Sequence, residues 1–158
     1  MFALYSKGCE YLLRALVCAL NDSSRKSFRA EDVCREAGVS ESFTRKSFQA
    51  LAKKGILITV RGPGGGYQLA TTPRHISVLD IIKAVEGEET FDRCSMGLEQ
   101  CGDETPCPIH EVWKRLKKTL LAELRQTTLL QLMKAAAKKK KAAAAGGNGF
   151  IKNPVVKI

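Results

Sequence analysis

The sequence predicts a mainly α-helical fold with a small β-hairpin wing. Apolar residues recur at helical spacing along most of the chain, and one β-rich stretch, ILITV at 56–60, leads into the glycine-rich turn RGPGGG at 61–66. The 158 residues suit one domain, or one domain with an appendage, and a hydrophobic fraction of 44% is enough for a core. No apolar run approaches the ~20 residues that a membrane span needs.

Three helices are predicted before the hairpin. The first covers residues 10–20, where leucines recur at helical spacing. The second covers residues 30–37 and ends at Gly38, a residue suited to the left-handed conformation that follows a helix. The third covers residues 41–54 and begins after Ser40, a good N-cap. Helix, glycine-containing turn, helix and two-stranded ribbon follow one another in the order of a winged helix-turn-helix.

Two further helices are predicted after the hairpin, which covers residues 56–70. Residues 77–87 give a short helix capped by Ser77, and residues 109–133 give a long helix with an apolar stripe. The chain therefore divides into three parts: a winged helix-turn-helix at 1–75; a linker helix, cysteine loop and long helix at 76–133; and a basic low-complexity tail at 134–158.

The formal net charge of +10 is unevenly distributed. Residues 134–158 contain seven Lys and no acid, so the preceding residues carry only +3. A basic chain favours a polyanionic partner, most often nucleic acid. For Lys138 to Lys141 we expect a solvated, mobile tail, and the alternative is a basic arm along the DNA backbone.

One polar face of the third helix and the hairpin tip are candidates for contact with double-stranded DNA. A helix fits the major groove, and its first turns face the base edges. Arg61 lies at the base of the tip, where a guanidinium can enter a narrow minor groove. Glycines in the tip allow close approach to a phosphate, although most such runs are plain tight turns. The candidate DNA-binding residues are Ser40, Ser42, Arg45, Lys46, Gln49, Arg61, Gly64, Gly65 and Tyr67.

The stretch CSMGLEQCGDETPCPIH, residues 94–110, gathers three cysteines and one of the two histidines. The N-terminus is unlike a secretory signal, so we expect a cytoplasmic protein whose clustered thiols stay reduced and serve metal or redox chemistry. Thiolates select zinc, cuprous copper and iron–sulfur iron. Structural zinc sites prefer short C-x2-C pairs, whereas the gaps here are six and five residues. The residues alone leave zinc and an iron–sulfur cluster equally open.

The segments RGPGGGYQLA and SVLDIIKAVEG, followed by three cysteines, resemble the Rrf-type winged-helix regulators of bacteria, the family of IscR and NsrR. The resemblance extends from about Ser6 to Met133 and implies a transcription regulator. It also implies that Cys94, Cys101 and Cys107 bind an iron–sulfur cluster whose state alters DNA binding.

The resemblance offers two candidates for the fourth ligand. His110 stands where IscR-like members place it, whereas NsrR-like members use an acid from the first helix of the partner subunit, which is Glu10 here. We expect a [2Fe–2S] cluster, with [4Fe–4S] or zinc as alternatives. Histidine in place of a thiolate raises the reduction potential of such a cluster.

The chain departs from the IscR-like pattern in two places. The first cysteine gap has one residue more, which Gly97 or Gly102 can absorb. Arg45 and Lys46 replace a Glu-Gln pair, so the operator sequence cannot be transferred from these relatives. We also expect a homodimer on a near-palindromic operator, with the long helix crossing its partner and burying four residues: Trp113, Leu116, Leu120 and Leu124.

Two alternatives to this hypothesis stay open. One is a DNA-binding regulator whose loop holds zinc or senses thiol oxidation, and the other is an adaptor whose winged helix binds protein. An enzyme is not expected, because no pairing of His, Asp, Ser or Glu indicates catalysis. The other cysteines, Cys18 and Cys34, are predicted to be small core residues, while Cys9 adjoins Glu10, and His75 is predicted to face solvent.

Overall fold

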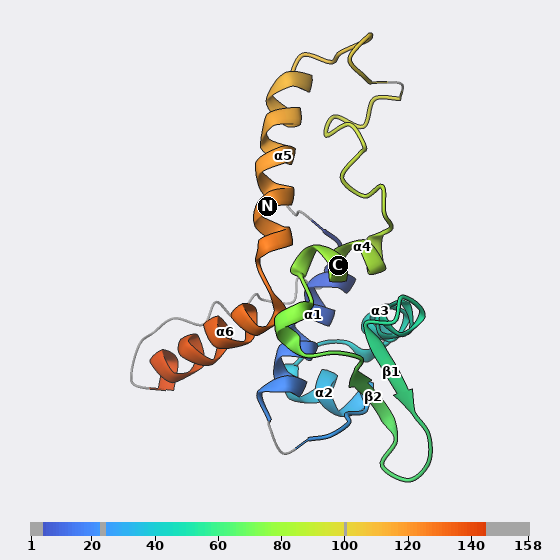
Figure 1. Cartoon of the computed structure of the whole chain (residues 1–158), viewed down its shortest axis with the longest axis vertical. Coiled ribbons are helices and arrows are strands. Elements are labelled where there is room, and N and C mark those ends of the chain that lie inside the picture. Colours follow the sequence, from blue (N-terminus) through green and yellow to red (C-terminus); the bar gives the residue numbers. More distant parts are fainter. Residues whose placement is uncertain (1–4, 23–24, 100, 145–158) are drawn as a thin grey trace, which may run out of the picture.

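A computed structural model describes residues 5–22, 25–99 and 101–144 and confirms a winged helix-turn-helix built from helices and one hairpin (Figure 1). Within these ranges no helix is both long and apolar enough to cross a membrane. The elements, in chain order, are α1 (Lys7–Asn21), α2 (Ala30–Ala37), α3 (Glu41–Lys53), β1 (Leu57–Val60), β2 (Gly66–Leu69), the 3-10 turn η1 (Pro73–His75), α4 (Val78–Glu86), α5 (His110–Gln126) and α6 (Leu129–Ala144).

The first three helices agree closely with the sequence prediction. Helix α1 begins earlier than expected, since the hydroxyl of Ser6 accepts a hydrogen bond from the backbone N–H of Cys9 at 3.2 Å. Helix α2 ends at Gly38, which has a φ of 63° and donates to the carbonyls of Cys34 and Arg35. Helix α3 begins after Ser40, as predicted.

The wing is fixed to α3 by aromatic packing. Strands β1 and β2 pair antiparallel, and the ring of Tyr67 stacks on Phe48 of α3 with centroids 5.4 Å apart. Phe28 exchanges backbone hydrogen bonds with Tyr67 at 2.7 and 2.8 Å. This approach explains Gly66, whose φ is +149°, because a Cβ there would lie 2.2 Å from the carbonyl oxygen of Phe28.

The core joins both halves of the chain. Leu12 and Leu16 of α1, Phe48 of α3, Ile81 of α4 and Leu129 of α6 have no exposed surface. Each such side chain contributes about 1.5–3 kcal/mol by leaving water. Because Leu129 lies in this core, the segment after the cysteine loop is anchored to the winged helix-turn-helix.

The prediction of one long helix at 109–133 is wrong. Helix α5 ends at Gln126, Thr127 is extended with φ −76° and ψ 114°, and α6 begins at Leu129. A capping box starts α6: the side chain of Gln131 accepts from the N–H of Thr128 at 2.7 Å, and the Thr128 hydroxyl accepts from the N–H of Gln131 at 3.3 Å. The freed carbonyl of Thr127 accepts from the N–H of Val78 at 2.8 Å.

Helix α5 stands away from the winged helix-turn-helix, and the cysteine loop lies beside it (Figure 1). Helix α6 packs on α1 and η1, with Leu132 and Met133 against the core. The predicted boundary before Lys134 therefore falls inside α6, where Lys138 to Lys141 are exposed helical residues. The rest of the predicted tail, residues 145–158, lies outside the described residues.

Candidate metal centre and DNA-reading surface

The loop between α4 and α5 brings the three predicted cysteine ligands together. The three sulfur atoms, those of Cys94, Cys101 and Cys107, all lie within 4.8 Å of one another. The sulfurs of Cys94 and Cys107 are 3.8 Å apart. The Nδ1 atom of His110 lies 3.3 Å from the sulfur of Cys101. All four predicted donors, including His110 at the first turn of α5, thus converge at one end of the molecule.

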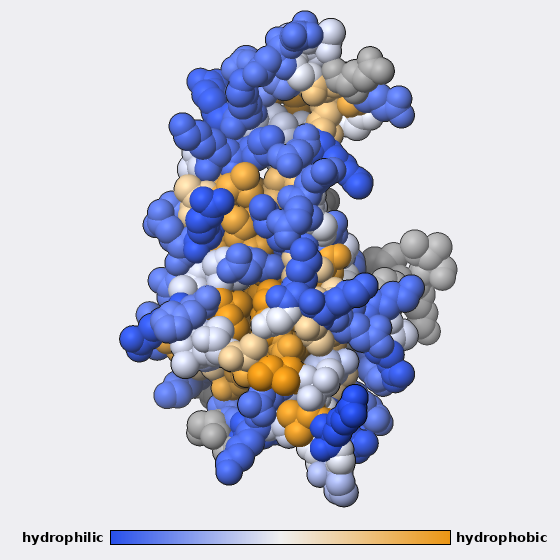
Figure 2. Space-filling view, turned by 45° about the vertical axis from the view of Figure 1, so that its right-hand side comes forward, coloured by the Kyte–Doolittle hydropathy of each residue, from blue (hydrophilic) through white to orange (hydrophobic). Residues whose placement is uncertain are grey.

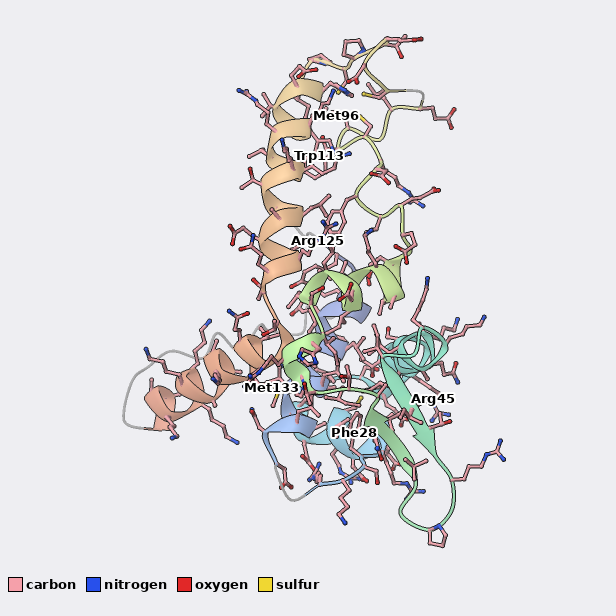
Figure 3. The ribbon with its side chains drawn as sticks, in the orientation of Figure 1. Phe28, Arg45, Met96, Trp113, Arg125 and Met133 are labelled. Atoms are coloured by element: carbon pink, nitrogen blue, oxygen red, sulfur yellow. The ribbon has the colours of Figure 1, made fainter. Side chains whose placement is uncertain are left out.

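Local backbone geometry explains the convergence. Gly97, with a φ of 71°, turns the chain back so that its N–H donates to the carbonyl of Cys94 at 3.0 Å. The N–H of His110 donates to the carbonyl of Cys107 at 3.0 Å, which starts α5 immediately after the last cysteine. The indole N–H of Trp113 donates to the carbonyl of Arg93 at 3.2 Å and ties the beginning of the loop to α5 (Figure 3).

The three thiols differ in electrostatics. Hydrogen bonds from the backbone N–H groups of Met96 and Leu98 lower the pKa of the Cys94 thiol to about 7. At Cys101 the N–H of Cys107 lowers the pKa, but desolvation and the neighbouring thiols outweigh it, so the net direction is upward. Cys94 is therefore converted to the metal-binding thiolate more readily than Cys101.

His110 has a second contact that the sequence analysis did not identify. Its Nε2 atom lies 3.1 Å from a carboxylate oxygen of Asp103, and the same oxygen accepts from Lys114 at 2.6 Å. Lys114 and then His110 lower the pKa of the Asp103 carboxyl. Asp103, His110 and Glu111 also have ligand atoms within 4.8 Å of one another. The i, i+4 spacing of His110 and Lys114 was a usable signal, but nothing in the sequence placed Asp103 beside them.

A cavity of about 260 Å³ opens beside the donors. Its lining includes Cys94, Cys101, His110 and Trp113. Thiols and an imidazole are the donors that zinc and iron–sulfur clusters take. The three sulfurs lie within 4.8 Å of one another and Nδ1 of His110 lies beside the sulfur of Cys101, so the site offers four soft donors for a metal ion or a cluster.

The other candidate residues lie elsewhere in the fold and have different surroundings. Glu10 pairs with Lys7 of its own helix at 2.7 Å and belongs to neither donor group, so its role as a partner-subunit ligand stays a prediction. Cys9 and Cys34 are fully buried, and His75 is exposed, as expected for a solvent-facing residue. The prediction for Cys18 is wrong: it is only partly buried, and its sulfur lies 3.7 Å from a carboxylate oxygen of the exposed Glu36.

The polar face of α3 is open for DNA contact. Ser42, Arg45, Lys46 and Gln49 are all exposed at i, i+3, i+4 and i+7 spacing, while Phe48 is buried. The hydroxyl of Ser42 is 2.8 Å from that of Ser40, and Arg45 forms an ion pair with Glu41 one turn earlier in α3. Four of the predicted donors therefore form one continuous row on the recognition helix.

The predicted wing residues divide into one open side chain and three with structural roles. Arg61 is exposed and has no ion pair among the described residues. The carbonyl of Gly64 accepts from the hydroxyl of Ser27 at 3.0 Å, and a Cβ at Gly65 would lie 2.4 Å from the carbonyl oxygen of Val60. Tyr67 packs its ring on Phe48. The turn and its packing account for both glycines and Tyr67, whose contact with DNA stays a prediction.

Comparison with known proteins identifies relatives across most of the chain. The family described as Rrf2, an iron-dependent transcriptional regulator, matches residues 5–135. The HTH-type transcriptional regulator IscR of Vibrio atlanticus is 33% identical over 131 residues, which cover 83% of this chain and 75% of the relative. IscR of Xenorhabdus nematophila is 32% identical over 131 residues, which cover 83% and 79%. These relatives are transcriptional regulators, which confirms the prediction that the chain is not an enzyme.

Solved structures agree with the fold. IscR of T. potens superposes with a TM-score of 0.66 at 27% identity, covering 85% of this chain and 89% of that one. CymR, the global cysteine regulator of B. subtilis, superposes with a TM-score of 0.67 at 24% identity, covering 85% and 98%. At that identity the likeness to CymR shows the fold alone.

Proposed function

Because the chain belongs to the Rrf2 family of transcriptional regulators, we propose that it is a homodimeric DNA-binding protein controlled by an iron–sulfur cluster. Cys94, Cys101, Cys107 and His110 would hold the cluster. The observation that carries the proposal is the convergence of three thiols within 4.8 Å in a chain that also presents an open recognition helix. The cluster would supply a redox-sensitive, anionic centre that orders the loop when bound.

Among the groups that three thiols and one imidazole can hold, the proposal names a [2Fe–2S] cluster, with [4Fe–4S] or zinc as the alternatives. Persistent thiols need a reducing compartment, so the proposal places the protein in the cytoplasm. The donors lie at the far end of α5 from the recognition helix, as the positions of Trp113 and Arg45 in Figure 3 show. A signal from the cluster would therefore act through α5 or through α4, which precedes the loop and packs on α3. Its effect is limited to the difference in DNA affinity between the two states.

The direct test is to purify the full chain without oxygen and to measure iron, acid-labile sulfide and zinc per chain. We expect iron and sulfide in equal amounts, about two of each per chain for a [2Fe–2S] cluster. Removal of the iron with a chelator should then change the affinity for an operator fragment selected from random DNA. A colourless protein that holds zinc would favour the zinc regulator. Equal DNA affinity with and without iron would disprove control of DNA binding by the cluster.

The second part of the proposal is that α5 pairs with α5 of another copy. The apolar residues Ile109, Val112 and Leu116 recur at i, i+3 and i+7 on α5 and are 39%, 48% and 59% exposed. Figure 2 shows hydrophobic surface along the middle of one face of the molecule. Leu120 and Leu124, which were also predicted to meet the partner, already pack against the core of their own chain. The contact is therefore proposed for the first half of α5.

Replacing Leu116 with aspartate is expected to separate the dimer. A two-fold interface contains Leu116 twice, and about 2 kcal/mol per site corresponds to a rise of about a thousandfold in the dimer dissociation constant. Sedimentation over a range of concentrations measures it. Lys118→Asp places the same side chain on the opposite face of α5 and should leave the dimer intact. A Leu116→Asp protein as dimeric as the Lys118→Asp control would disprove this interface.

The dimer has a geometric consequence for DNA. Two recognition helices related by a two-fold axis read half-sites about one helical turn apart, so the operator should be near-palindromic. Arg45 and Lys46 would contact base edges or phosphates from α3, and Arg61 would reach the adjacent minor groove.

A further inference from the structure

We propose that Asp103 is a positioning residue that determines which nitrogen of His110 faces the metal centre. Asp103 would hold the Nε2 side of the imidazole, so that Nδ1 is the ligating atom. This inference rests on the proposed function in so far as His110 is taken to be the fourth ligand.

The two ring nitrogens of His110 have different neighbours. Nε2 lies 3.1 Å from a carboxylate oxygen of Asp103, and Nδ1 lies 3.3 Å from the sulfur of Cys101. An ionised carboxylate only accepts hydrogen bonds, so the proton must lie on Nε2. A neutral imidazole has one such proton, and its Nδ1 then carries the lone pair that a metal needs. The observed contacts therefore select one tautomer and aim its lone pair at the cysteines.

Lys114 holds Asp103 in this position. Its ammonium group lies 2.6 Å from the same carboxylate oxygen, and it follows His110 by one turn of α5. The loop carboxylate thus accepts hydrogen bonds from two residues on one face of α5. A histidine that donates to a carboxylate while its other nitrogen binds metal is the usual outer-shell arrangement of metal sites, and it fixes ring orientation.

The exposed fraction of the Asp103 side chain indicates that it positions His110 and does not stabilise the fold. The side chain of Asp103 is 69% exposed and that of His110 only 16%, and exposed ion pairs contribute little to stability. Loss of the Asp103 carboxylate should therefore leave the fold intact and free the ring of His110 to rotate or to change tautomer.

The first test measures the tautomer in the full chain without iron. Nitrogen NMR of 15N-histidine-labelled protein at about pH 8.5 reports which nitrogen carries the proton. His75→Gln assigns the two histidines. We expect the proton on Nε2 of His110 in the wild type, a mixture of tautomers in Asp103→Ala, and recovery in Asp103→Asn, which keeps an oxygen acceptor. A wild-type proton on Nδ1, or an unchanged Asp103→Ala spectrum, would overturn the inference.

The second test uses the iron-loaded protein. Chelator should remove iron about 10- to 100-fold faster from Asp103→Ala than from wild type, because loss of an outer-shell partner weakens metal binding by that order. Selective 15N labels at Nδ1 and Nε2 identify the coordinating nitrogen from hyperfine coupling to the reduced cluster. We expect coupling from Nδ1. Coupling from Nε2 in the wild type would contradict the inference.

Glu104→Ala is the matched control, since it removes an exposed carboxylate one residue further along the loop. It should match wild type in both tests, and an equal effect of Glu104→Ala would show that only the charge of the loop matters, against a positioning role. The two proposals can fail separately. If the wild type holds no iron and sulfide, the proposed function fails, whereas the tautomer measurement still decides the role of Asp103.

Discussion

Replacing Cys107 with alanine is expected to give a folded protein that purifies without an iron–sulfur cluster. The sulfur of Cys107 lies 3.8 Å from that of Cys94, and Cys107 is only 9% exposed, so it supplies its thiolate from a buried position. Alanine keeps the backbone N–H that donates to the sulfur of Cys101. The change therefore removes one of four ligands and leaves the hydrogen bonding of the loop backbone in place.

The measurement is iron and sulfide per chain after anaerobic purification, together with the visible absorption spectrum. Cys18→Ala is the matched control, because Cys18 lies on α1 and belongs to neither donor group, and it should retain the cluster of the wild type. Circular dichroism shows whether both variants are folded. A Cys107→Ala protein with full iron, sulfide and colour would refute the ligand assignment.

Local signals explain why the winged helix-turn-helix could be predicted from the sequence. Gly38 is a capping residue whose preference depends on its own backbone conformation, so it marks a helix end without any knowledge of packing. Ser40 precedes α3 in an extended conformation, although its hydroxyl contacts that of Ser42 and does not cap the helix. The glycine run at 61–66 likewise encodes a turn directly. The break at Thr127 also had a local signal, the capping box from Thr128 to Gln131. The apolar pattern continues across this break, however, and so predicted a single helix.

The donor set could be predicted only in part, for a different reason. Thiols and imidazoles are typical metal ligands, so the residue types and their spacing were enough to predict four ligands: Cys94, Cys101, Cys107 and His110. Asp103 could not be predicted in this way, because acids are common in exposed loops and only the fold of residues 101–110 brings it to the ring of His110. Cys18 was misjudged because its apolar neighbours in sequence do not reveal that α1 ends near Glu36 and solvent.

Replacing Arg45 or Arg61 with alanine is expected to lower operator affinity about 5- to 150-fold each, the effect of losing about 1–3 kcal/mol of DNA contact. Arg45 is exposed on α3, and its ion pair with Glu41 is a solvent-screened i, i+4 surface pair, so turning toward a base costs little. Arg61 has no such pair to break among the residues that the structure describes. Loss of Arg45 should also reduce the ratio of the affinity for the operator to the affinity for unrelated DNA, because base contacts carry sequence information.

Binding isotherms at fixed salt on operator and on scrambled DNA measure both effects. Arg35→Ala is the matched control: it removes the same charge from an exposed helix position, where Arg35 pairs with Asp32 at 2.6 Å, outside the proposed interface. If the DNA affinities of the two variants differ from that of wild type no more than the affinity of this control does, the positive charge of the winged helix-turn-helix attracts DNA without recognising its sequence. The winged helix would then be better explained as a protein-binding adaptor, in which the open row on α3 contacts a polypeptide.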